Sequence, residues 1–197
     1  MATPALKPPP LQPEHWIDAA LSRLSRDGIE AVRVELLARD LGVSKGSFYW
    51  HFRDRADLLS RMLARWEGGE AAWLDAAISG VHSPASRWAR LVNRSIEPDR
   101  LRCEAGLRAW ARGDAAVASC LATIEGRRTA YIASILREVG FAPRAADTWA
   151  ELALLVCLGW FDRATRDEDF RLASGGLAEL LSEMILAASD RLVAPNP

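Results

Sequence analysis

Residues 42–52 of the chain read Gly-Val-Ser-Lys-Gly-Ser-Phe-Tyr-Trp-His-Phe, and this stretch decides the fold of the N-terminal part. The preceding residues 33–41 place apolar side chains three to four positions apart, which is the spacing of one helix face. Gly42 is suited to end that helix in the left-handed conformation, and the hydroxyl of Ser44 is expected to cap a second, short helix. A helix, a glycine turn and a capped short helix together predict a helix-turn-helix.

The second helix of this motif has an apolar face and a polar face. Val43, Phe48 and Phe52 are expected to anchor the helix to the core. The opposite face is then free to enter the major groove of DNA. The residues left for that face are Lys45, Ser47, Tyr49, Trp50 and His51.

Four of these side chains divide into two kinds of DNA contact. Tyr49 and His51 suit phosphate oxygens, which fix the position of a protein on the duplex without specifying sequence. Lys45 is expected to reach base edges, and Trp50 is expected to pack on thymine methyl groups. The alternative is that the aromatic side chains belong to the core. It is disfavoured because a short helix cannot turn a run of four large side chains inward.

The same residues carry a family resemblance. Residues 42–52, followed by Arg-Asp-Arg-Ala-Asp-Leu-Leu at 53–59, resemble the DNA-binding domain of the TetR family of transcriptional regulators. The resemblance covers residues 17–63, and the remainder matches that family only in length and helical character. It implies a regulator, usually a repressor, that a small ligand releases from its operator. It also implies that Arg55, at the start of a fourth helix, holds a phosphate with its flanking backbone amides.

Two positions depart from the family's pattern. Members usually have Ser or Thr where this chain has Arg33, and often a basic residue where it has Glu35. Arg33 is counted among the candidate DNA contacts. Two interpretations of Glu35 stay open: it accepts a hydrogen bond from cytosine, or it faces solvent. The operator sequence therefore does not transfer from a relative.

The composition favours an all-α protein without a uniformly basic surface. Half of the 197 residues are hydrophobic, 26% are charged and the formal net charge is −1. Residues 1–60 balance eight Lys or Arg against eight Asp or Glu, but residues 42–55 carry three basic side chains against one acid. A small positive patch on a neutral chain fits a protein that docks one face on DNA.

The chain divides into three predicted parts. They are a disordered arm at 1–12, a helix-turn-helix domain at 13–60, and a helical effector-binding and dimerisation domain at 61–193. The arm has one lysine, four prolines before residue 11 and no long apolar run, unlike a signal peptide. A long fourth helix is predicted to start at Asp54, a good N-cap, and to run toward Ile78. Gly68 and Gly69 are expected to kink it.

The remaining helices are predicted at 12–27, 84–97, 99–112, 115–139, 143–165 and 167–192. The helix at 143–165 is apolar nearly all round, so we expect it to be buried on every side, partly against a second subunit. Its longest apolar run, ten residues, is too short to span a bilayer, and no membrane contact is expected. The predicted interface of the homodimer comprises Leu152, Leu155, Val156, Phe161, Leu177, Leu181 and Met184. Two-fold symmetry would then match a palindromic operator.

Tryptophan is frequent, with eight residues in 197, six of them beyond the helix-turn-helix. An aromatic cavity for a flat or apolar effector is expected to be lined by Trp66, Trp73, Trp88, Cys103, Trp110 and Tyr131. Taken singly, each Trp is better explained as a core residue, and Cys103 as a buried, inert thiol.

The sequence offers no positive case for an enzyme, a metal site or a cofactor. The three histidines are dispersed, and neither a glycine-rich phosphate loop nor a nucleophile elbow occurs. Three cysteines without metal-type spacing indicate reduced thiols in a cytoplasmic protein. Two rival classes stay open: a helical small-molecule-binding protein without DNA binding, and an α-helical enzyme that uses the aromatic cavity.

Overall fold

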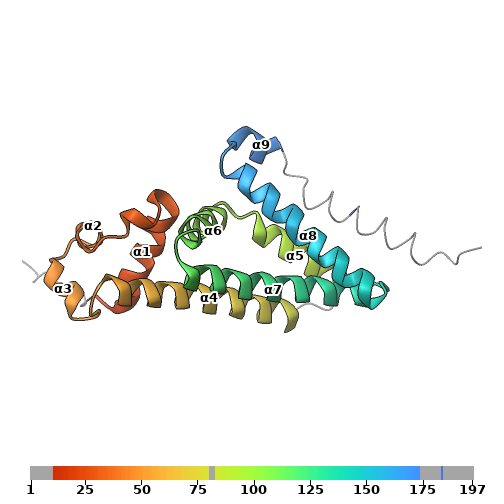
Figure 1. Ribbon diagram of the computed structural model, residues 1–197, viewed down its shortest axis with the longest axis horizontal. Coiled ribbons are helices and arrows are strands. Elements are labelled where there is room, and N and C mark those ends of the chain that lie inside the picture. The colour runs from red at the N-terminus through yellow and green to blue at the C-terminus, as the bar shows by residue number, and fades with distance from the viewer. Residues whose placement is uncertain (1–10, 80–82, 174–182, 184–197) are drawn as a thin grey trace, which may run out of the picture.

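The computed structural model describes residues 11–79, 83–173 and 183, and every element within them is helical. The elements are α1 (Pro13–Asp27), a 3-10 turn (Ile29–Ala31), α2 (Val34–Asp40), α3 (Lys45–Tyr49), α4 (Arg55–Ser79), α5 (Pro84–Ser95), α6 (Pro98–Ala111), α7 (Ala115–Glu138), α8 (Pro143–Ala164) and α9 (Glu168–Ala173). The predicted all-α class is confirmed. In Figure 1, α2 and α3 lie at one end of the molecule, and α4 runs from that end along α7.

The ends of the early helices follow from local chemistry. Gly42 has a φ of +67° just after α2, as predicted for a left-handed glycine. The Asp54 carboxylate accepts a hydrogen bond from the backbone N–H of Asp57 at 2.8 Å, which caps α4. Ser44 takes the N-cap position of α3 with an extended backbone, but its hydroxyl makes no capping hydrogen bond, so that part of the prediction is wrong.

The helix-turn-helix is held together by three buried aromatic rings. Trp16 and Phe48 meet edge to face with ring centroids 5.3 Å apart, and Phe48 stacks on Phe52 at 5.1 Å. All three rings are at most 2% exposed. Such contacts add specific geometry to the burial of apolar area, so they fix α3 against α1. Leu58 and Met62 of α4 complete the same core.

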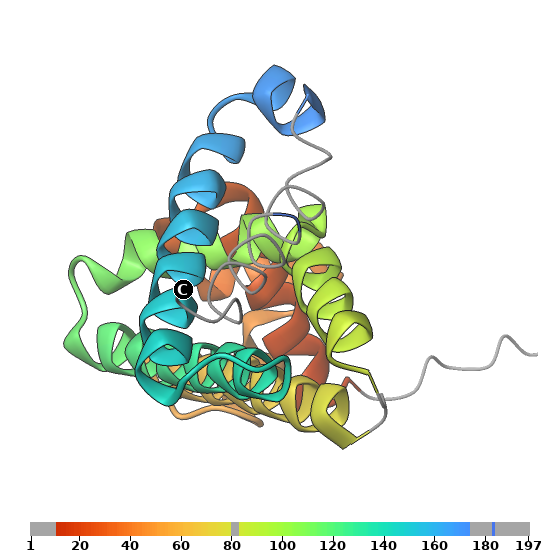
Figure 2. The same cartoon turned by 90° about the vertical axis from the view of Figure 1, so that its right-hand side faces the viewer.

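The C-terminal part consists of the second half of α4 and helices α5 to α9. Its helix starts were predicted: Ser83 caps α5 by accepting from Ser86 N, and Asp114 caps α7 by accepting from Ala116 N and Val117 N. Helix α4 continues unbroken through its glycine pair. Figure 2, viewed along the long axis, shows α5 and α8 on either side of the domain with α7 below them.

The two parts of the molecule meet where α1 packs on α6. Gly106 lies so close to α1 that a Cβ there would stand 2.7 Å from the carbonyl oxygen of Leu24. No real Cβ tolerates that approach to a backbone atom, so glycine permits the contact. The aromatic core also continues past residue 60 into Leu107 of α6 and Val117 of α7. The helix-turn-helix is therefore packed directly on the C-terminal part.

Helix α8 is partly exposed in the single chain, as a helix buried partly against a second subunit would be. Leu152 is 43% exposed and Leu155 is 56% exposed, so the helix is not buried on every side within one chain. Phe161, predicted to lie at a dimer interface, is instead 7% exposed and packs beside Trp160 in the chain's own interior. Leu177, Leu181 and Met184 of the predicted interface lie outside the described residues.

Candidate functional site

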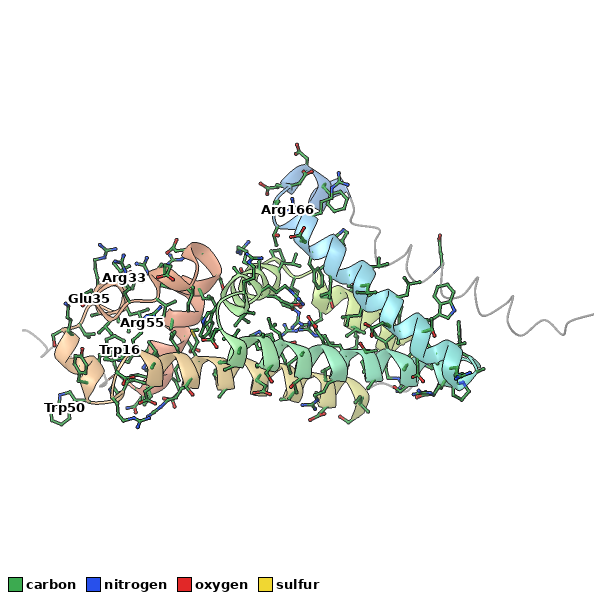
Figure 3. The ribbon with its side chains drawn as sticks, viewed as in Figure 1. Trp16, Arg33, Glu35, Trp50, Arg55 and Arg166 are labelled. Atoms are coloured by element: carbon green, nitrogen blue, oxygen red, sulfur yellow. The ribbon has the colours of Figure 1, made fainter. Side chains whose placement is uncertain are left out.

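The candidate nucleic-acid interface is the end of the molecule formed by residues 33–35 and 45–51, called here the distal surface. Figure 3 shows Arg33, Glu35 and Trp50 at this end, away from α8. Tyr49 is 63% exposed and Trp50 is 88% exposed, although the adjacent Phe48 is fully buried. The aromatic run is thus divided between core and surface, as the sequence analysis predicted.

Helix α3 is shorter than predicted from the sequence. Helix α3 has five residues, so Lys45, Ser47 and Tyr49 lie on it, whereas Trp50 and His51 lie in the turn that follows. Ser47 and His51 are half-buried, and the His51 ring lies against Phe52 with centroids 6.4 Å apart. The distal surface therefore joins one short helix to a turn.

Lys45 and Glu35 form an ion pair across the helix-turn-helix. The Nζ of Lys45 lies 2.7 Å from Oε1 of Glu35, and both side chains are 57% exposed. The hydrogen bond from Lys45 lowers the pKa of Glu35, so the carboxylate is ionised at neutral pH. Glu35 therefore does more than face solvent. Its carboxylate is held beside Lys45, the residue expected to reach base edges.

Arg55 occupies a structural position. Its Nε donates to the carbonyl of Val32 at 2.6 Å, and its Nη2 donates to the carbonyl of Ile29 at 2.9 Å. These two hydrogen bonds tie the start of α4 to the 3-10 turn. A phosphate contact by Arg55 would have to use its remaining N–H donors. The role that the structure supports better is to hold the start of α4 against the 3-10 turn.

A buried network of ion pairs lies in the C-terminal part. Arg128 of α7 donates to Glu104 of α6 at 3.0 Å and to Glu70 of α4 at 2.9 Å. All three residues are at most 5% exposed. Arg100 of α6 also donates to Glu70, and Arg108 donates to Glu104 at 2.7 Å. The network joins α4 to α6 and α7, and it was not predicted from the sequence.

The charges of this network stay ionised. Burial by itself would raise the pKa of Glu104, but the guanidinium groups of Arg128, Arg100 and Arg108 outweigh it and lower the pKa to about 2. The sequence did contain a signal. Glu70 continues the inward spacing of Trp66 and Leu74, where an apolar residue would be ordinary.

An apolar cavity adjoins the network between α5, α7 and α8. Its lining residues are Trp88, Leu91, Val92, Ser95, Arg128, Ile132, Leu154, Cys157 and Phe161. The cavity has a volume of about 20 Å³, enough for about one water molecule. Arg128 is the charged residue of this lining, so the cavity borders a residue whose side chain pairs with Glu70 of α4.

The six residues predicted to line one aromatic cavity do not meet. Trp66, Cys103 and Trp110 pack in the core shared with the helix-turn-helix. Trp73, Trp88 and Tyr131 pack in a second core between α4, α5, α7 and α8. Only Trp88 among them borders the 20 Å³ cavity. For the others, the ordinary interpretation as core or partly buried residues is the better one.

The three cysteines of the chain are free thiols. Burial raises the pKa of Cys120 and of Cys157 to about 11, and it also raises the pKa of Cys103. Thiols of this kind are weakly reactive near neutral pH. Within the described residues, no cluster of three or more His, Cys, Asp or Glu side chains is arranged for a metal ion. None of the helices described is long and apolar enough to cross a membrane.

Comparisons with known proteins agree with this geometry. Residues 17–62 match the family model described as bacterial regulatory proteins, tetR family. The chain is 36% identical over 58 residues to the HTH-type transcriptional regulator AcrR of Shigella flexneri, an alignment that covers 29% of this chain and 26% of that relative. The chain therefore aligns with about a quarter of that relative's length.

Solved structures match over nearly the whole chain. A transcriptional regulator from Rhodococcus sp. Rha1 aligns with a TM-score of 0.71 at 20% identity, over 90% of this chain and 97% of that one. The regulator FadR from Bacillus subtilis, solved in complex with stearoyl-CoA, aligns with a TM-score of 0.60 at 18% identity, over 86% of this chain and 97% of that one. These likenesses establish the fold.

The fold and the distal surface define an all-helical protein with a helix-turn-helix at one end. Its N-terminal domain, over residues 17–62, is similar to the DNA-binding domain of the tetR family of bacterial regulatory proteins.

Proposed function

We propose that the protein is a ligand-responsive transcriptional regulator, a repressor that binds a palindromic operator as a homodimer and is released by a small apolar or aromatic effector. The observation that carries the proposal is the distal surface, where Tyr49 and Trp50 stand exposed beside the fully buried Phe48. Two large aromatics held outward side by side form an exposed apolar patch, which is typical of a surface that contacts a partner.

The DNA contacts are the first part of the proposal to test. A duplex library randomised over about 20 base pairs, enough for two half-sites one helical turn apart, supplies an operator by selection. Tyr49→Ala and His51→Ala are expected to weaken binding to the selected and scrambled duplexes by similar factors, since phosphate contacts carry no sequence information. Lys45→Ala is expected to relax the preference for one base pair at one position of the operator. A folded Tyr49→Ala protein that binds both duplexes as tightly as wild type would remove the assignment.

The effector is proposed to enter the cavity beside Arg128. A molecule larger than water needs Trp88 or Phe161 to move, because the closed cavity holds about 20 Å³. The displacement would act on Arg128 and, through it, on Glu70 of α4, the helix that leads to the distal surface. An effector shifts this equilibrium only by its difference in affinity for the two states. The ligand-bound fold of FadR from Bacillus subtilis supports a ligand site in a domain of this shape.

This assignment is tested with a panel of aromatic and aliphatic compounds. A binding compound is expected to quench tryptophan emission, raise the melting temperature and lower operator affinity. Trp88→Ala, at the cavity wall, is expected to change the affinity for that compound, whereas Trp149→Ala, a half-buried Trp of α8 outside the lining, is the matched control. Equal changes in affinity in the two variants would mean that the compound does not bind in the cavity beside Arg128.

The homodimer is proposed to form through the outward face of α8. Leu152 and Leu155 are exposed there, and Val156 beside them is half-buried. Leu155→Arg is expected to place an unpaired charge in the interface and separate the subunits. Ile78→Arg is the control, since Ile78 is 50% exposed on α4. Sedimentation at micromolar concentration reports the result, and a folded wild-type monomer would exclude the model.

A second candidate, a helical ligand-binding protein without DNA binding, is favoured by one observation. Glu35 neutralises Lys45 at 2.7 Å and brings a negative charge to the distal surface. On this alternative the wild-type protein selects no duplex from the library while it still binds a compound of the panel. The main proposal also includes a cytoplasmic location and no catalytic activity. If it is right, a bound compound is recovered chemically unchanged after incubation with the protein.

A further inference from the structure

The ion pair between Glu35 and Lys45 is an unusual feature of a surface proposed to meet DNA. Glu35 lies in the first turn of α2, and Lys45 is the first residue of α3. The pair therefore spans the turn of the helix-turn-helix. Each side chain is 57% exposed, so neither is needed to fill the core.

Stability does not explain the pair. An exposed ion pair contributes about 0–1 kcal/mol to folding. A carboxylate on this surface is also repelled by the phosphates of an approaching duplex. The position of the Glu35 carboxylate is therefore best explained if it accepts a hydrogen bond from a donor on the DNA.

Base edges in the major groove supply such a donor. Cytosine offers its N4 amino group, and guanine offers the acceptors O6 and N7. In a G·C pair the cytosine N4–H donates to guanine O6, so the donor and the acceptor are about 2.9 Å apart. The Nζ of Lys45 and Oε1 of Glu35 are 2.7 Å apart, which is nearly the same spacing with the opposite polarity.

We propose that Glu35 and Lys45 together recognise a single G·C base pair in each half-site, an inference that rests on the proposed DNA binding. Lys45 donates to O6 and N7 of guanine, and the Glu35 carboxylate accepts from N4 of cytosine. The two side chains keep their mutual hydrogen bond, so the contact is pre-formed in the free protein. Glu35 is thereby a specificity-determining residue.

The neighbouring atoms of the base pair select G·C over A·T. An A·T pair also has a donor beside an acceptor, adenine N6 and thymine O4. Adenine N7, an acceptor, lies next to that donor and repels a carboxylate. The thymine methyl group stands beside O4, where it obstructs the ammonium group of Lys45. A G·C pair offers the lysine two adjacent acceptors on guanine, and its donor, cytosine N4, has an acceptor on one side only, whereas adenine N6 lies between two acceptors.

The test is selection from the randomised duplex library by the full-length protein and its variants. Wild type is expected to select G·C at one position of each half-site. Glu35→Ala and Lys45→Ala are both expected to lose that preference at the same position, by about 5- to 100-fold in relative affinity. The charge-swapped double variant, Glu35→Lys with Lys45→Glu, is expected to prefer the inverted C·G pair. Glu30→Ala removes one negative charge from an exposed position of the 3-10 turn and is expected to retain the wild-type preference.

The outcomes separate this inference from the function on which it rests. A wild-type protein that selects no duplex overturns the proposed DNA binding. A wild-type protein that selects an operator, with the two alanine variants relaxing different positions, overturns recognition of one base pair by both side chains. A uniform gain of affinity for all duplexes in Glu35→Ala, without a change of preference, also overturns it, because Glu35 then only neutralises Lys45.

Discussion

The two parts of the molecule are stabilised in different ways. The helix-turn-helix closes around Trp16, Phe48 and Phe52, and the buried charged residues of the described chain all lie beyond residue 62. The C-terminal part instead buries Glu70, Glu104 and Arg128 between three helices.

This difference has a physical consequence. Interlocked aromatic rings have one well-packed arrangement, so they hold the distal surface in a fixed geometry. Buried ion pairs are costly to break, but a guanidinium with five donors is able to exchange carboxylate partners without losing its charge compensation. We therefore expect the part proposed to bind DNA to be the more rigid, and the part proposed to bind an effector to be the more able to rearrange.

The largest expected effect comes from removing the central cation. Arg128→Met leaves Glu70 and Glu104 buried with fewer partners, and is expected to lower the free energy of unfolding by about 3–5 kcal/mol. Arg127→Met is the matched control, because its exposed pair with Asp75 contributes at most about 1 kcal/mol. Urea denaturation at neutral pH measures both. Equal losses in the two variants would mean that the buried network is no more important than a surface pair.

The next effect is a pH dependence that comes from the buried Glu104 of the C-terminal part. Folding lowers the pKa of Glu104 from 4.5 to about 2, so the ionised carboxylate stabilises the folded state above about pH 4.5. This contribution, on the order of 3 kcal/mol, is lost as the pH falls toward 2. Glu104→Gln is expected to be less stable at neutral pH and to lose less stability on acidification. Denaturation curves between pH 6 and pH 3 test this, and parallel losses in both proteins would contradict it.

A smaller effect is expected at the contact that joins the two parts. Gly106→Ala forces a Cβ against the Leu24 carbonyl oxygen and is expected to cost about 1–3 kcal/mol, despite the better helix propensity of alanine. Gly68→Ala in α4, where a Cβ meets nothing within 4 Å, is expected to gain about 1 kcal/mol. Thermal unfolding of both variants measures the difference. A stabilised Gly106→Ala protein would show that the two parts are able to separate slightly without cost.

The smallest effect on folding is expected at the distal surface. Trp50→Ala removes a side chain that is 88% exposed, so the free energy of unfolding should change by less than about 0.5 kcal/mol. Operator affinity is nevertheless expected to fall about tenfold, the size of one lost base contact. Ile78→Ala, another exposed apolar side chain, should change neither quantity. A Trp50→Ala protein that is destabilised but binds DNA normally would show that Trp50 supports the fold and does not contact DNA.

The helix-turn-helix was largely predictable because its signals are local. Gly42 and Asp54 adopt the turn and the cap that their chemistry favours, and Phe48 and Phe52 turn inward at helical spacing. The exceptions are also local. The Ser44 hydroxyl makes no cap, and α3 ends at Tyr49, directly before Trp50.

The candidate effector site was not predictable in the same way. The spacing of Trp66 and Trp73 correctly indicated a helix but could not show that the two rings pack in different cores. Cys103 and Trp110 were placed with Trp88 by residue type alone, and the structure separates them. A cavity depends on which helices meet, and composition does not carry that information.

The sequence by itself determined the all-helical class, the caps at Asp54, Ser83 and Asp114, and the division of the aromatic run into inward and outward residues. These features depend on spacing within one or two turns. Only the tertiary structure decided which charges meet. Glu35 lies ten residues from Lys45, and Glu70 lies 58 residues from Arg128. Partners at such separations are chosen by how the helices pack, and the burial that strengthens an ion pair is itself a property of the folded chain.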